Sequence, residues 1–288
     1  MTRVIARLAD ISSDYDTLFC DLWGCLHNGR EPYPAAVAAL QGFRKDGKRV
    51  VLMTNAPRPS QSVIAQLDRM GVPRDAWDIV VSSGDAAQVA MLDGWAGHNV
   101  WHLGTGKDDG FFNDLPEDRR DAAIVRVPFE VAEGIVNTGP FNETTETPED
   151  YRKTFQKAIA RDLPMLCANP DIVVDLGDRR IYCAGALAQL YAEMGGRVAL
   201  FGKPHAPIYD LARKRLGVDN SNRTLAIGDG IATDVLGAAE QGIDALFVTG
   251  GLAFDAFGDD VENPDHGMLT GWLDPHKLSP EFAIGRLR

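Results

Sequence analysis

The amino-acid sequence predicts an α/β protein with a doubly wound parallel sheet and an inserted α/β domain. Short β-branched and aliphatic runs alternate with amphipathic stretches in the first and last parts of the chain. The middle differs, because its apolar runs are briefer and its turns are rich in Gly, Pro, Asn and Asp. Alternating strands and helices are typical of a parallel sheet with helices on both faces, so the ends of the chain predict one such core.

The elements of this core follow from periodicity and length. In the first part the patterns predict strands at 17–20, 49–53 and 79–81 and helices at 34–45 and 60–70. In the last part they predict strands at 198–201, 224–227 and 245–248 and helices at 206–216 and 233–241. We therefore expect residues 1–82 and 185–288 to form the core domain, and residues 83–184 to form the inserted domain.

Composition excludes several classes of protein. The chain has 288 residues, 45% of them hydrophobic, which is ample for a sizeable core. Its net charge of -12 is spread along the chain and does not favour nucleic acid. No stretch is apolar enough for a signal peptide or a membrane span. The four cysteines show no CxxC spacing, and no histidine has the spacing of a zinc motif. We expect a cytoplasmic protein with reduced thiols.

Four segments place chemistry at the ends of strands. The run TLFC is followed by Asp21. The run VVLM is followed by Thr54 and Asn55, which present a hydroxyl and an amide suited to a phosphate. Taken singly, Asp21 could cap a turn and Thr54 could cap the helix that follows. Because open α/β sheets bind ligands at the carboxyl ends of their strands, these residues are candidates for one site.

The last part of the chain adds a lysine and two acids. Lys203 follows a short apolar run in LFGKPH, where an ammonium could neutralise a phosphoryl group, although most lysines are solvated surface charges. Asp229 and Asp234 lie in AIGDGIATD, which alone could be a turn and a helix cap. Three acids at one edge repel each other without a cation. Mg²⁺ is the usual oxygen-ligated ion at phosphoryl-transfer sites.

Asp21, Thr54, Lys203 and Asp229, in this order and each at a strand end, resemble the four motifs of the haloacid dehalogenase-like hydrolase superfamily. The inserted domain and the strings CANPD and GALAQLYAE resemble its class IIA branch, which includes NagD-type and pyridoxal-phosphate phosphatases. The resemblance covers nearly the whole chain. It implies a phosphoric monoester hydrolase that acts on a small phosphorylated metabolite. Because caps of this class often pair, it also allows a homo-oligomer, although the sequence has no long heptad seam.

The resemblance also implies the roles of the residues. Asp21 would be the nucleophile and form an aspartyl-phosphate, while Thr54, Asn55 and Lys203 would bind the phosphoryl group. Asp21, Asp229 and the backbone carbonyl of Trp23 would ligate Mg²⁺. Asp234 would orient a metal-bound water or Lys203. A carboxylate nucleophile of this kind divides one displacement into two easier ones.

The chain departs from the superfamily pattern at Trp23. Phosphatases of this superfamily usually have a second aspartate there, which protonates the leaving alcohol and then activates water, and tryptophan does neither. Three explanations stay open: His27 transfers the proton; the leaving group needs little protonation, as in an acyl phosphate, an aryl phosphate or an anhydride; or turnover has been lost and the protein binds a phosphometabolite. A histidine in such a loop can also serve only as a hydrogen-bonded loop residue.

The inserted domain is expected to choose the substrate, as mobile lids commonly do. Its candidate loops are 137–139 and 169–171, whose turn chemistry suits ligand contacts and ordinary turns alike. The string GTGKDD resembles a nucleotide-binding loop, but it lacks the first glycine and the Ser or Thr of that motif. We therefore exclude it.

Overall fold

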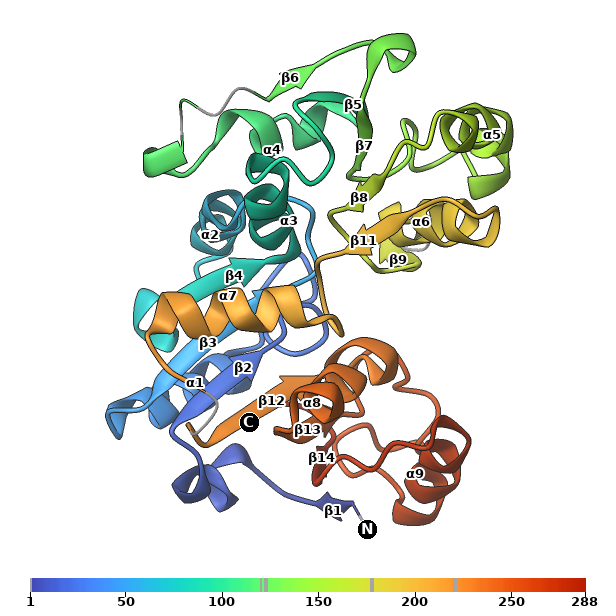
Figure 1. Cartoon of the computed structure of the whole chain (residues 1–288). Coiled ribbons are helices and arrows are strands. Elements are labelled where there is room, and N and C mark those ends of the chain that lie inside the picture. Colours follow the sequence, from blue (N-terminus) through green and yellow to red (C-terminus); the bar gives the residue numbers. More distant parts are fainter. Residues whose placement is uncertain (1, 120, 122–123, 177–178, 220–221) are drawn as a thin grey trace. The chain divides into compact units, whose positions relative to one another are not determined.

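The computed structural model describes residues 2–119, 121, 124–176, 179–219 and 222–288 (Figure 1). These residues form two compact units. The first unit comprises Met1–Thr54, Ile64–Val81 and Lys203–Arg288, and the second comprises Asn55–Val63 and Ser82–Gly202. Among the described residues, no helix has both the length and the apolar character needed to cross a membrane.

The first unit contains a seven-stranded sheet with the order β1-β14-β13-β12-β2-β3-β4. The strands are β1 (Arg3–Val4), β2 (Thr17–Cys20), β3 (Arg49–Thr54), β4 (Ile79–Ser82), β12 (Thr224–Gly228), β13 (Asp244–Val248) and β14 (Phe282–Ile284). β2 runs parallel to both of its neighbours, β12 and β3. All residues of β2 and β12 are buried, as expected of central parallel strands covered on both faces. The predicted doubly wound α/β fold is confirmed.

The helices associated with this sheet are α1 (Pro34–Lys45), α2 (Ser60–Arg69), α7 (Ala206–Leu216), α8 (Leu236–Gln241) and α9 (His266–Leu273). In Figure 1, α7 crosses in front of β3, and the two elements are in contact. α1 begins with Pro34, whose fixed φ and missing N–H suit the first turn of a helix. It buries Ala36, Val37, Leu40 and Phe43 on one face, the spacing of an amphipathic helix. Both α1 and α7 begin and end at the residues that their periodicity predicts.

The helix expected at 233–241 is divided into two parts. A π-helical turn at Ile231–Val235 precedes α8. The Asp234 carboxylate accepts hydrogen bonds from the backbone N–H of Gly230 and the hydroxyl of Thr233, both at 3.2 Å. Local side-chain bonds of this kind compete with the regular helical pattern, and π-helical turns are frequent at functional sites. Asp234 therefore lies in an irregular turn, at a position where the sequence predicted a regular helix.

The second unit contains a parallel five-stranded sheet with the order β11-β8-β7-β5-β6 and an antiparallel pair of strands, β9 and β10. The strands are β5 (Asn99–Leu103), β6 (Val125–Arg126), β7 (Gly134–Asn137), β8 (Met165–Cys167), β9 (Val173–Leu176), β10 (Arg179–Tyr182) and β11 (Val198–Leu200). The helices are α3 (Ser83–Leu92), α4 (Gly110–Asn113), α5 (Arg152–Ala160) and α6 (Ala184–Glu193).

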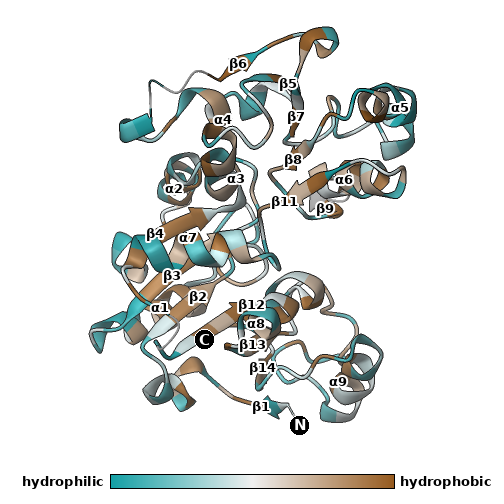
Figure 2. Ribbon diagram, in the orientation of Figure 1, coloured by the Kyte–Doolittle hydropathy of each residue, from teal (hydrophilic) through white to brown (hydrophobic). Residues whose placement is uncertain are grey.

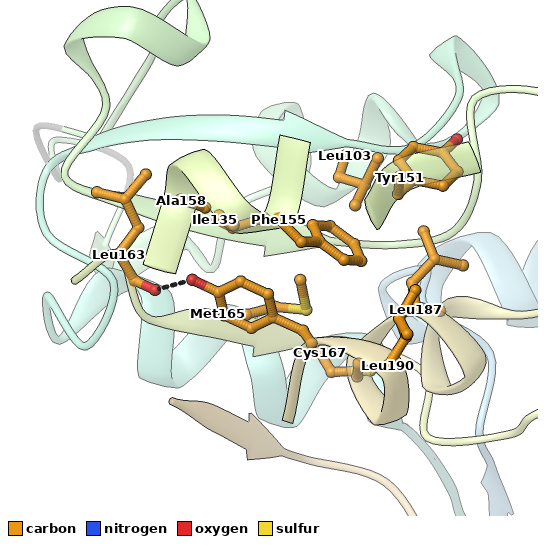
Figure 3. Close-up of a cluster of buried hydrophobic side chains, with 13 residues drawn as sticks. Leu103, Ile135, Tyr151, Phe155, Ala158, Leu163, Met165, Cys167, Leu187 and Leu190 are labelled. Carbon is orange, nitrogen blue, oxygen red and sulfur yellow. Dashed lines mark hydrogen bonds between the residues drawn. The ribbon is translucent and has the colours of Figure 1, made fainter. Parts of the chain in front are cut away.

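The core of the second unit lies between its sheet, α5 and α6. Figure 3 shows this cluster, in which Phe155 of α5 and Leu187 of α6 pack with Ile135 and Met165 of the sheet. The buried Tyr191 hydroxyl donates to the Leu163 carbonyl at 2.6 Å, which satisfies a polar group inside an apolar core. Figure 2 shows that hydrophobic residues, coloured brown, are concentrated in the strands.

The sequence assigned residues 185–202 to the core domain, but α6 and β11 belong to the second unit. β11 pairs in parallel with β8 through Val198, Ala199 and Leu200. α6 contacts both β8 and β11. A three-residue strand with ordinary aliphatic residues has the same local pattern in either sheet, so only its pairing partner distinguishes the two positions.

Candidate active site

Asp21 and Asp229 emerge side by side at the carboxyl edge of the seven-stranded sheet. Asp21 follows β2 and Asp229 follows β12, two strands paired in parallel with Cys20 opposite Ile227. The backbone N–H of Asp21 donates to the Ile227 carbonyl at 2.8 Å, which extends the pairing up to the acid itself. The parallel register therefore brings together two carboxylates that are 208 residues apart in the sequence, as the difference 229 minus 21 shows.

Lys203 joins this pair to a third acid. Lys203 is 3% exposed, and its ammonium donates to Asp21 Oδ1 at 2.5 Å and to Asp234 Oδ1 at 2.7 Å. Burial acts to lower the pKa of the Lys203 ammonium, but the charges of Asp21 and Asp234 and their hydrogen bonds outweigh burial and raise the pKa well above its usual value. Lys203 is therefore a fixed positive charge between two buried acids.

Asp234 is held by its surroundings in a position to orient Lys203. One oxygen accepts from Lys203, and the other accepts from Gly230 N and Thr233 Oγ1. The backbone of Gly228 passes so close that an added Cβ would lie 2.0 Å from Asp234 Cγ. Of the two roles expected for Asp234, these contacts favour the orientation of Lys203.

Asp229 is fixed by a loop that the sequence analysis did not select. Its Oδ2 accepts the backbone N–H of Leu252 at 2.9 Å. A Cβ at Gly24 or at Gly251 would lie 2.0 Å from the same oxygen, so both backbones approach the carboxylate more closely than any other residue allows. The consecutive glycines 250 and 251 are the sequence signal that could have identified this loop.

Burial and mutual repulsion make these acids hard to ionise. Burial raises the pKa of Asp21 to about 7, where the charge of Asp234 adds to the effect and Lys203 opposes it. Burial, followed by the charges of Asp21 and Asp234, also raises the pKa of Asp229 well above its usual value. A divalent cation would relieve both shifts, and buried carboxylate oxygens are the ligands that Mg²⁺ prefers. The residues present therefore fit a magnesium site.

Trp23 and His27 belong to the loop that follows Asp21. The Trp23 side chain is 43% exposed, and its ring meets that of His27 edge to face at a centroid distance of 5.5 Å. His27 is buried, and its Nδ1 accepts the backbone N–H of Gly29 at 3.0 Å. Burial lowers the pKa of His27 to about 4, so the imidazole is neutral near pH 7. These contacts favour His27 as a residue that holds the loop.

Thr54 and Asn55 lie at the point where the chain passes between the two units. Thr54 ends β3 and is buried, one residue beyond Met53, whose carbonyl accepts from Lys203 Nζ at 3.3 Å. Thr54 is thus close to the ammonium along the strand. In the second unit, the Asn55 amide donates to Asp171 Oδ1 at 2.7 Å. Thr54 therefore follows a residue that contacts Lys203, and the Asn55 side chain is engaged with Asp171.

The asparagines that begin the two expected specificity loops of the second unit are both buried, at 0% exposure for Asn137 and 8% for Asn169. The Asn137 side chain is fully buried and donates to the Ala184 carbonyl at 2.9 Å, so it ties β7 to the start of α6. In the other loop, Asn169 Oδ1 accepts the backbone N–H of Asp171 at 2.9 Å, as in an ordinary Asx turn. Asn137 is a structural residue by these contacts.

Known proteins share both the sequence and the fold. A model described as haloacid dehalogenase-like hydrolase matches residues 18–115, and a related HAD-hydrolase-like model matches residues 200–269. The crystal structure of a haloacid dehalogenase-like hydrolase from Brucella suis 1330 has 39% sequence identity and a TM-score of 0.82, covering 99% of this chain and 100% of that chain.

Two further relatives have names that state an activity. The 5'-nucleotidase YutF of Bacillus subtilis is 25% identical over 90% of this chain and 98% of its own length. The crystal structure of glycerol phosphate phosphatase Rv1692 from Mycobacterium tuberculosis, in complex with magnesium, is 26% identical, with a TM-score of 0.64 over 85% of this chain and 71% of that chain.

The fold and the cluster define a doubly wound α/β protein with a buried acid–lysine cluster at the carboxyl edge of its sheet. The chain belongs to the haloacid dehalogenase-like hydrolase family. The resemblance that the four strand-end motifs indicated is thereby confirmed.

Proposed function

We propose that this chain is a Mg²⁺-dependent phosphatase that acts on a small phosphorylated metabolite through an aspartyl-phosphate on Asp21. The observation that carries the proposal is the buried Lys203 ammonium, which bridges Asp21 and Asp234 beside Asp229. A buried cluster of three acids and one lysine costs solvation energy, so packing alone does not explain it. A site that receives a phosphoryl group and a cation does explain it.

In the first step, a carboxylate oxygen of Asp21 attacks phosphorus and the bond to the leaving oxygen breaks. Lys203 holds the carboxylate through Oδ1 and offsets negative charge on the phosphoryl oxygens. Thr54 would donate its hydroxyl to one of those oxygens. In the second step, water hydrolyses the aspartyl-phosphate and restores Asp21. Mg²⁺, when bound by Asp21, Asp229 and the Trp23 carbonyl, supplies further positive charge at the phosphoryl group.

The leaving group sets the difficulty of the first step. Proton transfer by a positioned acid is typically worth about 10²–10⁴-fold in rate. Trp23 has no acidic proton to transfer, and a neutral His27 that accepts from Gly29 has no excess proton to give. We therefore propose that the enzyme favours substrates whose leaving groups need little protonation, such as aryl or acyl phosphates, over simple alkyl phosphates.

The relatives support the reaction class and the metal. One curated relative is named as a 5'-nucleotidase, and a solved relative is a glycerol phosphate phosphatase in complex with magnesium. Both names refer to small phosphorylated compounds. The oxygen ligands of this chain's own site fit the same ion.

A phosphometabolite-binding protein with little or no turnover is the second candidate. The half-exposed Trp23 favours it, because this residue replaces the proton-transferring aspartate and offers an aromatic face instead. The retained cluster of Asp21, Lys203, Asp229 and Asp234 favours the enzyme. A pure binding protein needs no carboxylate nucleophile in contact with the bound phosphate.

Phosphate release from a panel of aryl, acyl, sugar and nucleoside phosphates, with and without Mg²⁺, tests the proposal. The wild type is compared with Asp21→Asn and with Asp46→Asn, a control at an exposed aspartate after α1. We expect Mg²⁺-dependent release by the wild type and the control, and no release by Asp21→Asn. Equal release by both variants would show that Asp21 is not the nucleophile. Saturable binding without release across the panel would favour the binding protein.

A further inference from the structure

Cys25 lies with two of the proposed magnesium ligands in one group. Its Sγ and one carboxylate oxygen each of Asp21 and Asp229 all lie within 4.8 Å of one another. Among the described residues, this is the one group of three or more His, Cys, Asp or Glu side chains close enough together to hold a metal ion. The thiol is 1% exposed and Asp229 is 7% exposed, so the group is shielded from solvent.

The Cys25 thiol differs in its contacts from the thiols of Cys20 and Cys167. Cys20 Sγ donates to the Asp21 carbonyl at 3.2 Å, and Cys167 Sγ donates to the Asn169 carbonyl at 3.2 Å. Within the part of the chain that the structure describes, Cys25 Sγ forms no hydrogen bond, and neither does Asp229 Oδ1, because Leu252 donates to Oδ2. A buried thiol without a hydrogen-bond partner thus lies beside the two carboxylates.

Burial of a small apolar side chain is the usual role of a free cysteine. Here two carboxylates, those of Asp21 and Asp229, lie near the thiol, and carboxylates gain nothing from an apolar contact. An ordinary cysteine thiol is protonated near neutral pH, so its proton must leave when a bond between sulfur and a metal forms.

We propose that Asp21, Cys25 and Asp229 form a binding site for a thiophilic divalent cation of the Zn²⁺ or Cd²⁺ class, which excludes Mg²⁺ when it binds. When the Sγ–metal bond forms, the thiol proton leaves to water, and no group is oxidised or reduced. Mg²⁺ uses the oxygens alone, since it prefers hard ligands and an octahedral shell that keeps several waters. A softer ion gains the sulfur as well.

The spacing suits a tetrahedral ion. Zinc bonds of about 2.0 Å to oxygen and 2.3 Å to sulfur hold neighbouring ligand atoms about 3.3–3.5 Å apart in a tetrahedral shell. The three atoms, at 4.8 Å or less, need to close by no more than about 1.5 Å. Since Asp21 and Asp229 serve both ions, the two ions compete for one position. Trace zinc would therefore inhibit by displacement.

Metal titration of the full-length, chelator-treated protein tests the proposal. The probes are Cd²⁺, followed by ultraviolet thiolate-to-metal charge-transfer absorption, and Zn²⁺ and Mg²⁺, followed by calorimetry. The variants are Cys25→Ser and Cys20→Ser, the second being a matched control at a buried thiol outside the group. We expect a charge-transfer band for the wild type and Cys20→Ser, and none for Cys25→Ser. Loss of the sulfur ligand should weaken Zn²⁺ binding by at least about tenfold and leave Mg²⁺ binding within about threefold.

Three results would overturn the proposal. They are a wild type without the charge-transfer band, a Cys25→Ser variant that keeps the band, and unchanged Zn²⁺ affinity in a folded Cys25→Ser variant. If that variant does not fold, ¹¹³Cd NMR of the wild type decides, because the shift distinguishes a shell containing sulfur from one of oxygen alone. An all-oxygen shell would refute the role of Cys25. None of these readouts depends on phosphatase activity.

Discussion

Replacement of Lys203 by methionine, which has a similar length and no charge, is the strongest test of the buried cluster. In the wild type, the ammonium lies 2.5 Å from Asp21 and 2.7 Å from Asp234. Its removal leaves two buried carboxylates facing each other without a cation. Breaking a buried ion pair by removing one partner typically costs about 3–5 kcal/mol. For a chain of this size, we expect the melting temperature of Lys203→Met to fall by about 6–20 °C near pH 8.

This loss should shrink as the pH falls. In the wild type the folded-state pKa of Asp21 is already raised to about 7, and Lys203 is the group that opposes the rise. Without Lys203 the folded protein holds the Asp21 proton to still higher pH, above the value in the unfolded chain. Stability from such a group is present at low pH and is lost as pH rises through the folded pKa. Lys203→Met should therefore lie closer to the wild type at pH 5.5 than at pH 8.

Thermal unfolding of chelator-treated protein at both pH values measures these differences. The matched control is Lys107→Met, at a lysine whose side chain is 55% exposed and paired with Glu143 on the surface. Surface pairs contribute about 0–1 kcal/mol, so this variant should change little at either pH. If Lys203→Met melts with the control, or if its deficit is independent of pH, the reasoning about a buried charge cluster is wrong.

Three further predictions concern the same site. Trp23→Asp should raise the rate of Mg²⁺-dependent hydrolysis of an alkyl phosphate by up to about 10²-fold, and that of an aryl phosphate much less. Equal gains for both substrates would show that the wild type is not limited by protonation of the leaving group. Gly24→Ala should weaken Mg²⁺ binding and lower stability more than the control Gly47→Ala. Both glycines have a positive φ, +73° and +77° respectively, but an added Cβ meets Asp229 only at Gly24. Calorimetry and thermal unfolding would measure the two effects, and equal losses in both variants would show that backbone strain alone is responsible. Mg²⁺ should raise the melting temperature more at pH 8 than at pH 5.5, because the ion must displace the Asp21 proton at the lower pH, and a rise independent of pH would contradict the raised pKa.

The strand-end pattern could be read from the sequence because it depends on local periodicity. Buried strands such as β2 and β12 are short apolar runs, and the polar residue that follows each run lies at the carboxyl edge of a parallel sheet. The bounds of α1 and α7 were likewise predicted to the residue. The family followed from four such positions in a fixed order.

The roles of individual side chains were less accessible, because they depend on residues that are distant in the sequence. His27 becomes a neutral loop residue only through burial and the Gly29 amide. Asp229 is positioned by Leu252, and Cys25 comes within reach of two carboxylates only when the loop after β2 folds against the end of β12. No local pattern records these approaches.

The sequence by itself determined the fold class, the order of the four motifs and the departure at Trp23, since each is a property of composition and spacing along the chain. The tertiary structure decided which sheet β11 joins, which partner each acid has, and which thiol lies beside the acids. The physical reason is that strand pairing, burial and electrostatic coupling arise between segments far apart in the chain, and their energies exist only once those segments meet.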